Sequence, residues 1–177
     1  MLFSIILVSV NLLINRSSNN TTGAKTIQKP LSAAESKAIM KKWEATHAGI
    51  FYNEWKASSA GKRVFTSESK IRMYLKEFKN MEGIVTSLSL PPGSMLGFGI
   101  MVKIKSEYYI LTFNAVNNND NSKELEQLHH LKVNDKIIIR SHNVSHAPKY
   151  AFPIVSGDYI EKDGKTIFKR IPNKGGC

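Results

Sequence analysis

Between residues 81 and 171, short runs of strand-forming residues alternate with turn signals, and this pattern constrains the fold more than any other feature of the chain. In the run 82–90, Ile84, Thr86 and Leu88 share one face of a period-two alternation, which is typical of a β-strand. Similar runs follow at 98–105, 108–113, 136–140, 150–160 and 166–171, with a short helix expected at 122–128. We therefore predict a mainly β (α+β) fold, with a small five-stranded barrel over 81–171 preceded by a helical segment.

The region ahead of the barrel, residues 25–80, is predicted to be a basic linker followed by helices. Ser32 and Glu35 have the spacing of a capping box, which indicates a helix start. A second helix is expected over 66–79, and its apolar residues Ile71, Tyr74, Leu75 and Phe78 recur at i, i+3, i+4 and i+7. Such a stripe usually packs on its own domain, so we expect this helix to cover one end of the barrel. No internal repeat is apparent.

The formal charge of +11 is concentrated in front of the predicted barrel. Residues 25–80 contain 12 lysines and arginines against 5 acidic residues, whereas residues 81–177 contain 12 against 9. Two interpretations stay open. The excess is typical of ordinary solvated lysine-rich helices, and it also attracts phosphate groups or an anionic lipid surface.

The first 14 residues are apolar, with Asn11 as the one strongly polar member, and are too short to span a bilayer. Residues 1–24 are therefore expected to be a signal peptide or a short membrane anchor, with small residues at 22–24 near a cleavage point. Because no lysine or arginine precedes the apolar run, a third interpretation is the last membrane segment of a longer protein. The expected location is exported or membrane-associated, in the periplasm or cell envelope, and cytoplasmic if this segment is not a signal.

Three features of the β region together resemble a known fold. They are the start 82–85 (Glu-Gly-Ile-Val), a helix between the third and fourth strands, and the stretch 131–139 (Leu-Lys-Val-Asn-Asp-Lys-Ile-Ile-Ile). This pattern resembles the OB-fold, in particular small bacterial OB domains of the tRNA-anticodon-binding-like type. Those domains have a glycine where this chain has Asn134, and asparagine tolerates the positive φ of such a turn. The resemblance covers roughly residues 81 to 160.

The resemblance implies a ligand-binding surface on the second and third strands, which in many relatives holds oligonucleotides or oligosaccharides. Carried over to this sequence, that outer face would contain Met101 and the predicted ligand-binding residues Lys103, Lys105, Tyr108 and Thr112, with Arg140 nearby. Two lysines beside a tyrosine are suited to holding phosphates and stacking a base. The predicted alternative function is accordingly a single-stranded nucleic-acid (RNA or DNA) binding protein.

No residue pattern predicts catalysis, a metal site or a cofactor. His142 and His146 are four residues apart, but they lie beside a strand end, where that spacing does not converge on a metal. The sequence has no phosphate-binding loop, nucleophile elbow or dinucleotide fingerprint. The single cysteine, Cys177, excludes an internal disulfide and lies in a predicted flexible tail, 172–177. We therefore predict a non-enzymatic binding or interaction module for a protein, a glycan or a small ligand, with anionic lipid as a further candidate partner.

Overall fold

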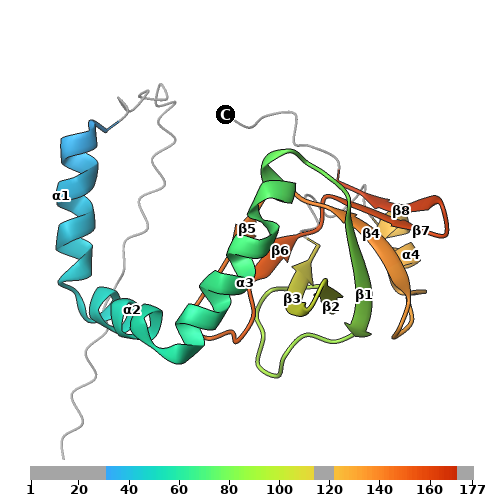
Figure 1. Ribbon diagram of the computed structural model, residues 1–177, viewed down its shortest axis with the longest axis horizontal. Helices are drawn as coiled ribbons and strands as arrows, with labels where there is room; N and C mark the ends of the chain where they lie inside the picture. The colour runs from blue at the N-terminus through green and yellow to red at the C-terminus, as the bar shows by residue number, and fades with distance from the viewer. Residues whose placement is uncertain (1–30, 114–121, 171–177) are drawn as a thin grey trace, which may run out of the picture. The chain divides into compact units, whose positions relative to one another are not determined.

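The computed structural model describes residues 31–113 and 122–170, which form an α+β protein with a helical segment ahead of a mixed β-sheet (Figure 1). The helices are α1 (Ala33–Glu44), α2 (His47–Ala57), α3 (Ser59–Lys76) and α4 (Ser122–Leu128). The strands are β1 (Met81–Ser87), β2 (Gly99–Ile104), β3 (Glu107–Thr112), β4 (Lys136–Arg140), β5 (Val144–Ser145), β6 (Ile154–Ser156), β7 (Tyr159–Lys162) and β8 (Lys165–Lys169). Among the described residues, those from Met40 onward form one compact unit.

The eight strands form one sheet in the order β5-β6-β3-β2-β1-β4-β7-β8, with only β3 and β6 parallel. The sheet is open, so the expected five-stranded barrel is wrong. Helices also hold more of the described residues than strands do, and a mainly β fold is not confirmed. The expected barrel is not formed because the predicted strand 150–160 is interrupted at Gly157 and Asp158. Its two halves then pair separately, β6 with β3 and β7 with β4.

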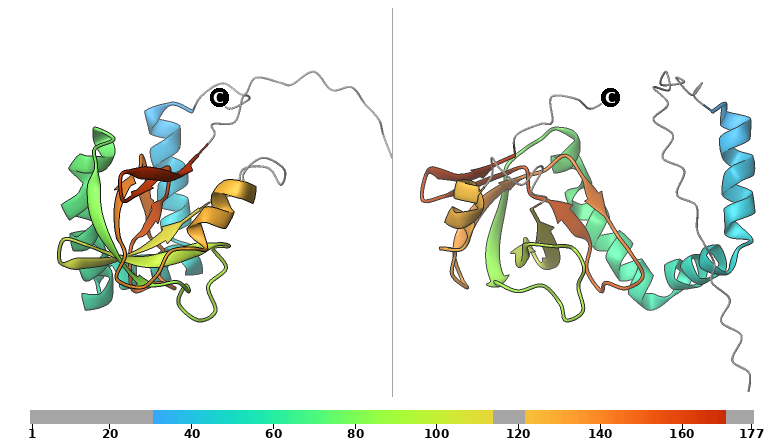
Figure 2. Two further views of the ribbon diagram at one scale, coloured as in Figure 1. Left: turned by 90° about the vertical axis from the view of Figure 1, so that its right-hand side faces the viewer. Right: turned by 180° about the vertical axis from the view of Figure 1, so that it is seen from behind.

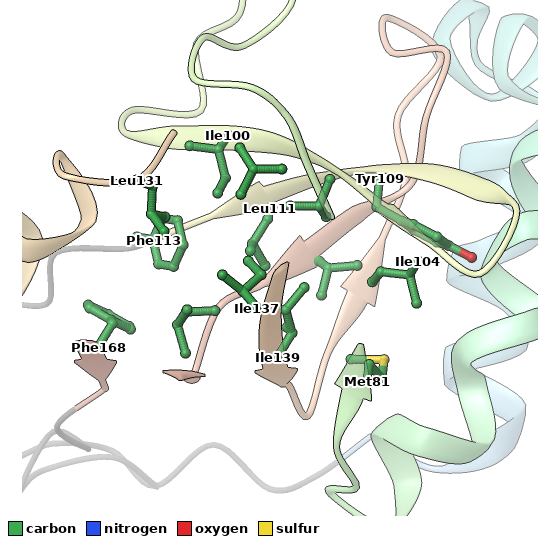
Figure 3. Packing of buried hydrophobic residues seen from close by; sticks show 14 of the residues in the cluster. Met81, Ile100, Ile104, Tyr109, Leu111, Phe113, Leu131, Ile137, Ile139 and Phe168 are labelled. Atoms are coloured by element: carbon green, nitrogen blue, oxygen red, sulfur yellow. The ribbon is translucent and has the colours of Figure 1, made fainter. Parts of the chain in front are cut away.

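The main hydrophobic core lies on the inner face of this sheet (Figure 3). The residues of β2, β3 and the position after β3 that alternate with the predicted outer face are buried, namely Ile100, Val102, Ile104, Tyr109, Leu111 and Phe113. From α3, Ile71 and Leu75 join the same core, which confirms the predicted stripe as a packing face. Phe78 differs, because it follows the helix end at φ +49° and is exposed.

Hydrogen bonds fasten α3 to the start of β3, beside which the helix lies in Figures 1 and 2. The Tyr109 hydroxyl donates to the carbonyl oxygen of Ser67 at 2.7 Å. The Ser67 hydroxyl in turn donates to the Glu107 carboxylate at 2.9 Å, and Lys70 pairs with the same carboxylate. The hydrogen bonds from Lys70 and Ser67 lower the pKa of Glu107. Burial raises the pKa of Tyr109, so its hydroxyl stays protonated and remains a donor.

One seven-residue pattern, Trp-x-Ala-Thr/Ser-x-Ala-Gly, occurs at 43–49 and again at 55–61, and each copy forms the turn between two helices. In both turns the hydroxyl of Thr46 or Ser58 accepts the amide hydrogen of the following glycine at 3.2 Å. The same hydroxyls donate to the preceding tryptophan carbonyl oxygen, at 2.7 Å from Thr46 and 2.6 Å from Ser58. The expectation of no internal repeat is therefore wrong. We call these turns the first and second elbow.

Each elbow requires its glycine, because the two helices approach too closely for a side chain. A Cβ atom on Gly49 would lie 2.2 Å from the carbonyl oxygen of Trp43, and one on Gly61 would lie 2.1 Å from that of Trp55. Both distances are far below van der Waals contact, and the obstacle is backbone, which cannot rotate away. The sequence therefore fixes both turns through a hydroxyl cap and a close glycine contact.

A partly buried polar cluster, which we call the imidazole clasp, connects the helices to the segment after β5. The His146 ring accepts or donates at both nitrogens, with Nδ1 at 2.8 Å from the Glu68 carboxylate and Nε2 at 2.7 Å from the Tyr52 hydroxyl. Its faces pack against Trp55 and Phe65, with centroid distances of 5.8 and 4.4 Å. Glu68 is only 4% exposed, and its carboxylate is held by His146 and Arg72.

The turn into β4 has the geometry that the sequence predicts. Asn134 adopts φ +75°, the positive φ that was expected at this position. The Asp135 carboxylate accepts the amide hydrogen of Lys132 at 2.8 Å and pairs with Lys162. The hydrogen bond from Lys162 is the larger cause of a lowered Asp135 pKa.

We expect Asp135→Asn to lower the free energy of unfolding by about 1 kcal/mol near neutral pH, because the ion pair is partly shielded from water. A lowered folded-state pKa means that the carboxylate stabilises the fold above its ordinary pKa of about 4. That contribution is lost as the pH falls through the folded-state value. Urea unfolding of both proteins across this range should show the difference shrinking in acid, and an unchanged difference would contradict this role for the carboxylate.

Candidate functional site

Two rows of side chains cross the outer face of the sheet on β2, β1, β4 and β7. Ile84 on β1 lies opposite both Lys103 on β2 and Lys136 on β4, and we call these three residues the lysine row. Two residues away along β1, Glu82 lies opposite Ile138 on β4, which in turn lies opposite Glu161 on β7; these form the glutamate row. Each row therefore has an isoleucine between two like charges.

Strand alternation is the reason that these side chains face outward. Along β1 the buried residues Met81, Gly83 and Val85 alternate with the exposed Glu82 and Ile84. On β4, Ile137 and Ile139 are buried among the core residues, and the residues between them point away from it. Adjacent positions on one face of a strand are about 7 Å apart, so this is the spacing of the two rows along the strands.

The two rows line a groove of about 810 Å³, which we call the outer groove. Tyr74 of α3 and Asn80 contribute one wall, Lys105 lies at the turn between β2 and β3, and Asp163 and Gly164 lie at the turn between β7 and β8. Asp163 and Gly164 both have positive φ, which is typical of an Asp-Gly hairpin turn. The groove is thus framed by two hairpin turns and floored by isoleucine side chains.

The charges of the outer groove are not neutralised by one another. Within residues 31–113 and 122–170, neither the three groove lysines nor Glu82 and Glu161 take part in an ion pair. Glu161 accepts a hydrogen bond of 2.7 Å from the Tyr159 hydroxyl. The groove therefore presents a cationic row and an anionic row that remain available to a ligand.

Three of the five predicted site residues lie close to this groove. Lys103 and Lys105 line it directly. The Lys105 ammonium lies 4.6 Å from the centre of the Tyr74 ring, a cation–π contact. Tyr108 lies opposite Lys103 in the β2–β3 pair, is 43% exposed, and has its ring 5.8 Å from the Lys103 ammonium.

The structure does not bring Thr112 and Arg140 to the groove. Thr112 is buried, and its hydroxyl donates to the carbonyl oxygen of Val155 at 3.4 Å. Met101, expected on the same outer face, is also buried, because a second small core forms there with Ile110, Tyr150 and Ile154. Arg140 donates from Nε to the Asn80 side chain at 2.6 Å and stacks over Tyr159. Its guanidinium is therefore occupied by protein groups.

Sequence reasoning missed the charged residues on β1, β4 and β7, namely Glu82, Lys136 and Glu161. The alternation in 136–140 does separate Lys136 and Ile138 from the buried Ile137 and Ile139, so the outward face of β4 was predictable. The neighbouring strand of β4 was not predictable, because the pairing of β1 with β4 joins residues about fifty positions apart. Only that pairing places Lys136 beside Ile84 and Lys103.

The two histidines four residues apart belong to separate clusters. His142 pairs with the buried Asp158, which also accepts from Arg170 at 3.2 Å, whereas His146 belongs to the imidazole clasp. In the part of the chain that the structure describes, no group of three histidine, cysteine or acidic side chains is arranged to hold a metal ion. Across the same residues, no helix is both long and apolar enough to cross a bilayer.

Comparison with known proteins gives no match to a family model, to a curated protein or to a solved structure.

Proposed function

We propose that this protein is a non-catalytic binding module whose outer groove receives an extended polypeptide segment. The observation that carries this proposal is the pair of unneutralised rows, Lys-Ile-Lys and Glu-Ile-Glu, about one strand repeat apart. In an extended peptide, residues two apart also point to the same side at this spacing. An acidic and a basic residue separated by one residue would therefore meet the lysine row and the glutamate row together.

The mixture of charges favours a polypeptide over a polyanion. A nucleic-acid backbone would place phosphates near Glu82 and Glu161 as well as near the lysines, and like charges in close contact are unfavourable. The apolar floor adds to this argument, because Ile84 is 39% exposed and contacts aliphatic or backbone atoms better than phosphate.

The strand pairing supports a relationship to the OB-fold type that the sequence resembles. Strands β1, β2 and β3 form an antiparallel series, α4 lies between β3 and β4, and β4 returns beside β1. The bent segment 154–162 then pairs in parallel with β3 and antiparallel with β4. We also propose an exported or membrane-tethered location, which is supported by the apolar composition of residues 1–14.

Binding of a labelled pentapeptide, Thr-Asp-Val-Lys-Thr, tests the groove. We expect the paired change Lys103→Glu and Lys136→Glu to weaken its affinity by about tenfold, because two attractive contacts at a partly exposed site become repulsive. Fluorescence anisotropy at low salt measures this affinity. The control Lys165→Glu with Lys169→Glu makes the same change in charge on exposed positions of β8.

Two further peptides sharpen the test. Thr-Asp-Lys-Val-Thr has the same composition but places its charges on opposite sides of an extended chain, and it should bind more weakly. The doubly reversed groove should instead prefer Thr-Lys-Val-Lys-Thr. Equal binding of all three peptides to the unmodified protein would refute the proposal.

Single-stranded nucleic acid is a second candidate, favoured by one observation. Tyr108 is exposed beside Lys103 at the edge of the groove, which is the combination that stacks a base and holds its phosphate. Titration with an oligothymidine at several salt concentrations distinguishes the two functions. Steeply salt-dependent binding that is lost in Tyr108→Ala would identify the nucleic-acid function instead.

A further inference from the structure

A second surface, independent of the outer groove, lies on the first elbow. Met40 and Trp43 from the last turn of α1 and Ile50 and Phe51 from the first turn of α2 are between 40 and 56% exposed. We call these four residues the elbow patch. All four flank a single turn within twelve residues of the sequence, and exposed apolar patches on a protein surface mark interaction sites.

The apolar residues of α2 divide into two sets with different environments. Tyr52 and Trp55 point toward His146 and complete the imidazole clasp, with centroid distances of 6.0 and 5.8 Å. Ile50 and Phe51 remain exposed to solvent. The helix therefore already has a packed side, and the elbow patch is not the side that attaches α2 to the sheet.

The elbow holds the patch in a fixed geometry. The Thr46 side chain bonds both the Trp43 carbonyl and the Gly49 amide, and the Trp43 ring contacts Tyr52 at a centroid distance of 5.6 Å. Gly49 packs directly on the end of α1. The turn between α1 and α2 is thus held by side-chain and backbone contacts, which limits the conformational entropy that its backbone loses on binding.

The helices that carry the patch are basic. Over residues 31–79 there are 10 lysines and arginines against 5 glutamates. Lys41 and Lys42 lie within the patch sequence, are exposed, and form no ion pair with any residue that the structure describes. Glu44 and Glu54 lie nearby and reduce the local excess, so the attraction to an anion comes from the helices as a whole.

We infer that the elbow patch binds the surface of an anionic lipid bilayer. Tryptophan, phenylalanine and methionine beside lysines are the composition of helices that lie in the membrane interface with the apolar side in the acyl boundary. Lysines near such a surface are attracted to anionic headgroups. A second copy of the chain is a poorer occupant, because a symmetric contact would bring two sets of lysines together. The apolar run 1–14 lies fewer than twenty residues ahead of α1, so the chain can bring this surface to a membrane.

Quenching of tryptophan emission by lipids brominated on their acyl chains tests this inference on the full chain. The protein has 2 tryptophans, Trp43 and Trp55, so the signal reports on the helices and not on residues 1–14. The vesicles are phosphatidylcholine alone, and phosphatidylcholine mixed two to one with phosphatidylglycerol. We expect quenching on the mixed vesicles and little on the neutral ones.

Variants separate the apolar and the electrostatic contributions. Ile50→Gln with Phe51→Gln should abolish the quenching, whereas Met95→Gln, at an 87% exposed site in the loop between β1 and β2, should leave it unchanged. Lys41→Gln with Lys42→Gln should raise the half-saturating lipid concentration by about tenfold or more. Far-UV circular dichroism checks that each variant keeps its helices.

Three results would overturn the inference. The first is co-sedimentation with vesicles without quenching, which would mean that another part of the chain binds the lipid. The second is quenching in the Ile50→Gln and Phe51→Gln double variant that equals the quenching in the unmodified protein. The third is a dimer in sedimentation equilibrium that this double variant abolishes, which would assign the elbow patch to a second copy. None of these measurements depends on the outer groove.

Discussion

Gly61→Ala is expected to lower the free energy of unfolding by about 3 kcal/mol, the upper part of the range for overpacked sites. The added Cβ would lie 2.1 Å from the Trp55 carbonyl oxygen, so α2 and α3 must separate. Separation breaks the bond from the Gly61 amide to the Ser58 hydroxyl and moves Trp55 away from His146. The gain in helix propensity from alanine, about 1 kcal/mol, is too small to offset this.

Urea unfolding followed by circular dichroism and by tryptophan emission measures the effect. Ser59→Ala is a suitable control, because it alters an exposed residue of the same turn and should be neutral or slightly stabilising. Gly49→Ala provides a contrast: α1 has no buried residues, so the first elbow should open without destabilising the sheet. Equal stability of Gly61→Ala and the unmodified protein would show that the second elbow is not close-packed in solution.

His146→Ala is expected to lower the free energy of unfolding by about 3 kcal/mol or more. The change removes the contacts of the imidazole with Tyr52, Trp55 and Phe65 and leaves the buried Glu68 carboxylate with Arg72 alone. A buried charge that loses a partner is costly, and the cavity left by the ring adds to this cost.

The same urea titration measures this loss, with His130→Ala as the control because His130 is exposed. A second variant isolates the carboxylate. In Glu68→Gln the side chain keeps its shape and can still accept a hydrogen bond from His146, so its effect should be smaller than that of His146→Ala. If His146→Ala is as stable as the control His130→Ala, the imidazole clasp does not hold the helices to the sheet.

Local patterns predicted much of the fold. The capping box at Ser32 and Glu35 is formed, with the Glu35 carboxylate accepting from the Ser32 amide at 2.8 Å. The strands predicted at 98–105 and 108–113 and the short helix at 122–128 are confirmed as well. In each case the determining interaction lies within a few residues, so alternation, capping and turn chemistry contain the necessary information.

Predictions failed where distant segments determine the structure. Thr112 and Met101 alternate as outward residues would, yet both are buried: Met101 packs with Tyr150 and Ile154, and the Thr112 hydroxyl donates to the carbonyl oxygen of Val155. The break at Gly157 has a similar origin: a Cβ there would lie 2.5 Å from the Phe113 ring. Neither contact leaves a signal in the local pattern.

The candidate site was partly predictable for the same reason. Lys103, Lys105 and Tyr108 follow from one hairpin, and all three lie at or beside the outer groove. The glutamate row spans β1, β4 and β7, whose order in the sheet differs from their order in the chain. The mixed charge of the groove, which favours a peptide over a polyanion, was therefore not visible before the strands were paired.

The bent segment 154–162 affects when the sheet can form as the chain emerges from the ribosome. Its first half pairs with β3 and its second half with β4, and both β5 and β8 join the sheet only through it. A nascent chain that has emerged as far as Arg140 can form β1 to β4, but the apolar residues of those strands remain uncovered on both flanks. We therefore expect the sheet to complete its pairing only after residues 154–169 have emerged, and shorter nascent chains to expose unpaired strand edges.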